Sequence, residues 1–79
     1  MNIQVGRQAL SKPELERVVL SYLRMLPACQ HIEAVEIAHR AKSERNWALL
    51  GTRPPLSTLG DNAARNALAE LQRDFRLAV

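Results

Sequence analysis

The chain has 79 residues, a formal net charge of +3 and one cysteine, and 47% of its residues are hydrophobic. A chain of this length forms one small domain, residues 1–79, and buries roughly 60 to 65% of its unfolded surface. The composition excludes a disordered chain and a membrane-spanning one, and a single cysteine excludes an internal disulfide. Because "MNIQVGRQAL" has neither the apolar core nor the cleavage site of a signal peptide, we expect a cytoplasmic protein.

The first predicted element is a helix over residues 11–26, preceded by residues 1–9, which we expect to be loosely ordered. Ser11 and Glu14 have the spacing of a capping box, and Pro13 falls in the first turn, where its missing N–H costs nothing. Apolar residues then recur at helical spacing, and Pro27 ends the element. This face consists of Leu15, Val18, Val19, Tyr22, Leu23 and Leu26.

The middle of the chain, "HIEAVEIAHRAKSERNWALLGTRPPL", suits a helix by composition but a hairpin by periodicity. Glu44 and Arg45 interrupt the only apolar face that a helix could present. Residues 35–40 and 47–52 instead alternate with a period of two, which is typical of half-buried strands. We therefore predict strands at 33–40 and 46–53, with "RPP" ending the second because proline cannot donate to a ladder.

The last predicted element is a helix over residues 58–76, with Thr58 or Asp61 as its cap. Arg73 and Arg76 would lie in its last turn, where the helix dipole favours cations. Its apolar stripe consists of Ala64, Ala67, Leu68, Leu71 and Phe75.

Together these elements predict an α+β domain of order α-β-β-α, with two helices packed on an antiparallel hairpin. The single tryptophan, Trp47, is expected in the core rather than at an interface. The predicted core consists of Leu15, Val18, Val19, Tyr22, Leu23, Val35, Ile37, Trp47, Leu49, Leu68, Leu71 and Phe75.

Four segments, "LSKPELERVVL", "ACQHIEAVEI", "NWALL" and "ELQRDF", resemble a group of short uncharacterised bacterial proteins. In that group a capped helix, a cysteine turn, a V-x-I strand, an N-W strand and a final helix follow one another. Where the group usually has glycine before the cysteine, this chain has Ala28. The resemblance implies the same order of elements and carries no function.

The residue types that could support chemistry are poorly placed for it. Cys29, His31 and His39 are three soft ligands, but an extended strand would separate the two histidines by roughly 25 Å, too far to share an ion. Glu33 and Glu36 would lie on opposite faces of a strand, so they cannot act as an acid–base pair. We therefore expect neither an enzyme nor a cofactor, metal or small-molecule substrate.

The preferred functional interpretation is a small interaction module that acts as a homodimer. A two-stranded hairpin is marginal in water, and its open edges offer unpaired backbone groups to a second copy. Because "RPP" protects the second strand, the expected dimer edge is the first strand, at Val35, Glu36, Ile37, Ala38 and His39.

The alternative interpretation is a nucleic-acid-binding regulator, either a helix-turn-helix or a basic hairpin. The sequence pI is about 9.8, and the stretch from His39 to Arg53 is locally basic. The phosphate contacts would then be Arg40, Lys42, Arg45 and Arg53. Against this, the cations are scattered along the chain among eight acidic residues, which is typical of a mixed-charge surface.

Overall fold

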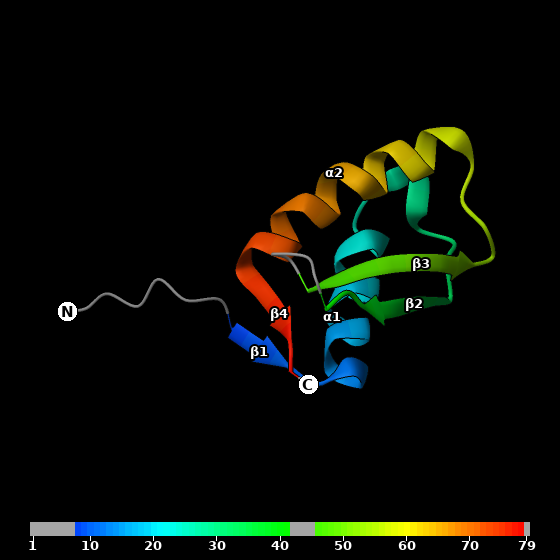
Figure 1. Cartoon of the computed structure of the whole chain (residues 1–79). Coiled ribbons are helices and arrows are strands. Elements are labelled where there is room, and N and C mark those ends of the chain that lie inside the picture. Colours follow the sequence, from blue (N-terminus) through cyan, green and yellow to red (C-terminus); the bar gives the residue numbers. More distant parts are fainter. Residues whose placement is uncertain (1–7, 42–45, 79) are drawn as a thin grey trace.

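The computed structural model describes residues 8–41 and 46–78, which form an α+β domain (Figure 1). The two helices and the antiparallel hairpin are confirmed, and a small parallel sheet is added to them. The elements are β1 (Gln8–Leu10), α1 (Lys12–Arg24), the 3₁₀ turn η1 (Pro27–Cys29), β2 (Ala34–His39), β3 (Trp47–Arg53), α2 (Thr58–Asp74) and β4 (Phe75–Leu77).

Helix α1 begins with the predicted capping box. The Ser11 side chain accepts a hydrogen bond from the Glu14 N–H over 3.4 Å, and Glu14 Oε1 accepts one from the Ser11 N–H over 3.0 Å. These reciprocal bonds satisfy backbone donors that have no partner inside the helix, and they hold the pKa of the Glu14 carboxyl below its ordinary value. The helix ends at Arg24, two residues before the predicted boundary.

The β2–β3 hairpin contains a bulge at Leu50. Glu36 pairs with Gly51 and Ile37 pairs with Leu49, so Leu50 has no partner on β2. An extra residue of this kind changes which side of the strand the following side chains occupy. Before the bulge, Ile37 and Leu49 face the core by alternation, and Leu50 is exposed at the surface.

Helix α2 is capped by Ser57, whose hydroxyl accepts a hydrogen bond from the Gly60 N–H over 3.1 Å. The prediction of Thr58 or Asp61 as the cap is therefore wrong. Thr58 is instead the first helical residue, and Asp61 lies in the first turn, where its charge suits the helix dipole.

The small parallel sheet differs from the predictions at both ends of the chain. Gln8 and Ala9, expected to be loosely ordered, belong to β1, which pairs with β4. Phe75 and Arg76, expected at the end of a helix, belong to β4. The physical reason is tertiary: Phe75–Leu77 pair with Gln8–Leu10 of β1, and the Phe75 C=O accepts a hydrogen bond from the Trp47 indole Nε1 over 3.1 Å.

Asn46 joins this small sheet to the hairpin. Its Nδ2 donates to the Leu77 C=O over 2.8 Å, and its Oδ1 accepts from the Leu77 N–H over 3.0 Å. The side-chain amide thus pairs with β4 much as a neighbouring strand would. Asn46 has a φ of 40°, in the left-handed region that asparagine tolerates better than most residues.

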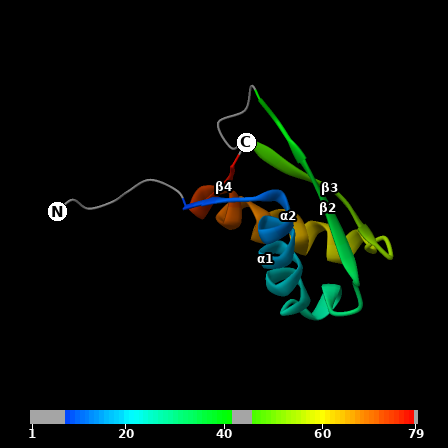
Figure 2. The same ribbon diagram turned by 90° about the horizontal axis from the view of Figure 1, so that it is seen from below.

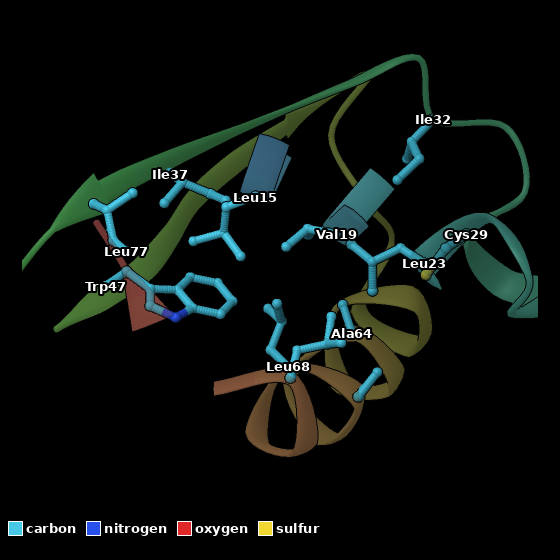
Figure 3. Packing of buried hydrophobic residues seen from close by; sticks show 12 residues of the cluster. Leu15, Val19, Leu23, Cys29, Ile32, Ile37, Trp47, Ala64, Leu68 and Leu77 are labelled. Carbon is cyan, nitrogen blue, oxygen red and sulfur yellow. The ribbon is translucent and has the colours of Figure 1, made fainter. Parts of the chain in front are cut away.

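The core lies where α1, α2 and one face of the hairpin meet (Figure 3). The Trp47 ring points from β3 toward Leu15 of α1 and Leu68 of α2, and it is 1% exposed, so its predicted place in the core is confirmed. The remaining predicted core residues are buried or half-buried and pack against this cluster. The predicted list did not include the buried residues Cys29, Ile32, Ala64, Ala67 and Leu77.

Candidate interaction groove along β3

Along β3, the backbone N–H and C=O groups of every second residue point away from β2. The Arg40 N–H donates to the Asn46 C=O over 2.9 Å, so these residues form a hydrogen-bonded pair. Because bonded and non-bonded pairs alternate along an antiparallel ladder, Trp47 and Leu49 direct their N–H and C=O groups outward. The Trp47 C=O indeed accepts a hydrogen bond from Gln72 Nε2 of α2 over 2.8 Å. Leu49 therefore offers a backbone donor and acceptor at the outer edge of β3.

A groove of about 640 Å³ runs along this edge, between β3 and α2. Figure 1 shows β3 between α2 and β2, so the groove lies on the side of β3 where a further strand would be added. Within the described residues, β2 is the only strand that pairs with β3. The groove is lined by Leu49, Leu50, Gly51, Thr52, Pro55, Leu56, Asp61, Ala64, Arg65, Leu68 and Gln72.

The charges at the groove neutralise each other. Of its lining residues, all in the described part of the chain, Asp61 and Arg65 are the charged ones. Arg65 Nε lies 2.9 Å from Asp61 Oδ2, one helical turn away. An exposed pair of this kind adds little stability, but it leaves neither charge free to select a charged ligand. The groove therefore gives no reason to prefer a charged ligand, and its lining is polar and apolar in about equal parts.

Leu50 is an exposed apolar side chain at the mouth of this groove. It is 56% exposed, it is the bulged residue of β3, and it lines the groove. Leu59 is also largely exposed, at 72%, but it is not among the groove residues. The two exposed leucines thus provide a test position and a control position.

The edge of β2, the expected dimer edge, is partly covered by α1. The Ile37 N–H points outward by the same alternation and donates to Glu16 Oε2 of α1 over 3.2 Å. Figure 2 shows α1 beside β2. Ile37 is buried, Val35 and Ala38 are half-buried, and Glu36 and His39 are exposed. The central amide of this edge is therefore already used within the chain.

A second depression, of about 490 Å³, is lined by α1, β2 and β3 and shares Leu50, Gly51 and Thr52 with the groove. Lys12 and Glu16 of α1, Glu36 of β2 and Arg53 of β3 contribute two charges of each sign to its lining. It has no apolar floor comparable with that of the groove along β3.

The residues predicted to contact nucleic acid do not form one described cluster. Arg40 follows the end of β2 at the hairpin tip, whereas Arg53 pairs with Ala34 at the opposite end. Six strand residues separate these ends by about 20 Å. Lys42 and Arg45 lie outside the described residues. The helix-turn-helix version is wrong, because residues 34–39 and 47–53 form strands.

Cys29, His31 and His39 are not brought together. Cys29 is buried beside the start of α2, where its Sγ lies 3.5 Å from the Gly60 C=O, and burial raises the pKa of the Cys29 thiol. His31 and His39 are exposed at opposite ends of the segment that contains β2. Among the described residues, no group of three potential metal ligands gathers at one place.

Sequence reasoning did not identify the groove residues Gln72 and Leu50 as functional candidates. The one signal available was the pair of consecutive leucines at 49 and 50, one of which an alternating strand must expose. Gln72 gave no signal, because its contact with Trp47 depends on the way α2 lies along β3.

No family model, curated protein or solved structure matches this chain. Among the described helices, none is long and apolar enough to cross a membrane.

Proposed function

We propose that this chain is a small, non-enzymatic protein-interaction module that binds an extended segment of another chain by strand addition at the edge of β3. The observation that supports this proposal is the outward-facing backbone of Leu49 beside a groove whose floor is formed by apolar residues of α2. An edge strand next to a groove lets the backbone supply affinity while side-chain pockets supply selectivity.

The preferred ligand is a strand with no charged side chain among the residues that pair beside Leu49. Ala64, 1% exposed, and Leu68, 7% exposed, provide the apolar floor. The Asp61–Arg65 pair gives no reason to prefer a ligand of either charge. A cytoplasmic location is part of the proposal, since a chain with one cysteine forms no internal disulfide.

The proposal places strand addition at β3 rather than at the β2 edge that the sequence suggested. A strand arriving at β2 would have to displace the Glu16 carboxylate from the Ile37 N–H. At β3 the N–H and C=O of Leu49 face the groove, whereas the Trp47 C=O accepts from Gln72, so a ligand strand can pair at Leu49 and leave Trp47 in that contact.

The test uses a synthetic peptide with the sequence of residues 47–53, WALLGTR, followed by two lysines for solubility. On titration into the labelled protein, we expect NMR shift changes at Leu49, Leu56 and Leu68, and slower hydrogen exchange of the Leu49 amide. A scrambled peptide of the same composition is the control. Shift changes confined to other surfaces at saturating peptide would contradict the proposal, and saturable binding of duplex DNA at Arg40 would support the nucleic-acid alternative.

A further inference from the structure

We propose that the strand received by this groove is β3 of a second copy, paired antiparallel about a twofold axis. This inference rests on the proposed strand addition at β3 and names its partner.

The first argument is the chemistry of the available strands. From Trp47 to Thr52, β3 carries no charged side chain, which matches a groove whose charges are already paired. By contrast, β2 carries Glu36 in its centre, and Glu36 would bring an unpaired charge into the contact. Of the two hairpin strands, β3 is therefore the one that suits the groove.

The second argument is symmetry. When the same edge serves both partners, a single twofold contact covers both open edges at once. Leu49 directs its N–H and C=O outward, so it can form a hydrogen-bonded pair with Leu49 of the second copy. This register places the exposed Leu50 opposite the half-buried Ala48 of the second copy, twice in each dimer. A large and a small side chain then pack on the face of the hairpin that the core does not cover.

The proposed dimer contact is small. Each partner contributes one strand of seven residues and the groove beside it. A contact of this size belongs with transient interfaces, for which we expect a dissociation constant of about 1 to 100 μM. The dimer should therefore form and dissociate within the concentration range of ordinary solution measurements.

Sedimentation equilibrium of the full chain between 1 and 200 μM tests the inference. The expected mass rises from 8.9 kDa toward twice that value. L50E introduces a charge at the twofold contact. Because this charge would lose water there without gaining a partner, we expect dimerisation to weaken by at least about tenfold. L59E makes the same change at an exposed leucine outside the groove and should leave dimerisation unchanged. Circular dichroism of both variants verifies that they fold.

Cross-linking tests the register. In a background where Cys29 is changed to alanine, A48C and L50C chains are prepared separately, mixed and oxidised. Residues in a non-hydrogen-bonded antiparallel pair have Cα atoms about 4.5 Å apart, a separation that suits a disulfide. The expected product joins one A48C chain to one L50C chain, in excess over either homodimer.

Each result separates this inference from the proposed function. A chain that stays at 8.9 kDa up to 200 μM yet binds the WALLGTR peptide at Leu49 would overturn the twofold dimer and leave strand addition supported. A dimer that is equally stable in L50E and L59E, or that gives no mixed disulfide, would place the contact on another surface and also overturn the inference. A monomer that does not bind the peptide at Leu49 would contradict both.

Discussion

Gly60 lies where the first turn of α2 comes closest to η1. A Cβ at this position would lie 2.9 Å from the backbone oxygen of Ala28 and 3.3 Å from Leu56 Cδ2. Because a backbone oxygen cannot move away cheaply, we expect G60A to reduce the free energy of unfolding by about 1 to 3 kcal/mol, despite alanine's better helix propensity. Urea unfolding measures this change.

The control is G51A, since a Cβ at Gly51 would meet nothing within 4 Å. Its effect on the free energy of unfolding should be within about 0.5 kcal/mol, as for an exposed substitution. Equal stability of G60A and G51A would show that α2 does not approach η1 as closely as described.

The Asn46 amide gives a second test of a single side chain. In N46D, the donor to the Leu77 C=O is replaced by a carboxylate oxygen, while the size and the tolerance of positive φ are retained. We expect a loss of about 1 to 3 kcal/mol in the free energy of unfolding at pH 7, because two acceptors then face each other. N66D, at an exposed position of α2, is the control, and comparable losses in both would argue against the Asn46–Leu77 contact.

Between the two helices, Tyr22 of α1 donates a hydrogen bond to Glu70 Oε1 of α2 over 3.0 Å. This bond and the charge of Glu70 raise the pKa of Tyr22 above its ordinary value of 10.0. A group such as this phenol, whose pKa is higher in the folded than in the unfolded protein, stabilises the fold at pH values below its unfolded pKa. That contribution is lost as the pH rises through the folded pKa.

Because Tyr22 is the only tyrosine, its ionisation can be followed by ultraviolet absorbance without overlap from another phenol. We expect a midpoint above 10.0 in the folded protein and a lower midpoint in E70Q, which lacks the charge. Identical midpoints in both proteins would mean that the two helices do not meet at this pair.

The stability of the whole domain depends on one small core. A 79-residue domain has a free energy of unfolding of about 4 to 12 kcal/mol. Leu68 is 7% exposed, and L68A should cost about 2 to 5 kcal/mol, a large share of that total. Fluorescence of Trp47, the single tryptophan and a core residue, follows the unfolding. L59A, at a position that is 72% exposed, should melt like the unmodified protein, and an equally stable L68A would show that α2 does not contribute to the core.

Local patterns in the sequence determined the elements that are built from neighbouring residues. The capping box at Ser11 and Glu14 and the helical spacing of apolar residues predicted α1. Alternation, with the break at Glu44 and Arg45, predicted the hairpin against the helical composition of the same stretch. These predictions succeeded because capping and periodicity act between residues that are close in the chain.

Tertiary contacts decided the rest. β1 and β4 are three residues each and pair across more than sixty positions, so neither carries a period long enough to recognise. The covering of Ile37 by Glu16, and the groove along β3, likewise depend on where α1 and α2 come to rest. A local pattern shows which face of a strand is apolar, but only the packing of the helices shows which of its edges stays open, because that depends on contacts between residues far apart in the chain.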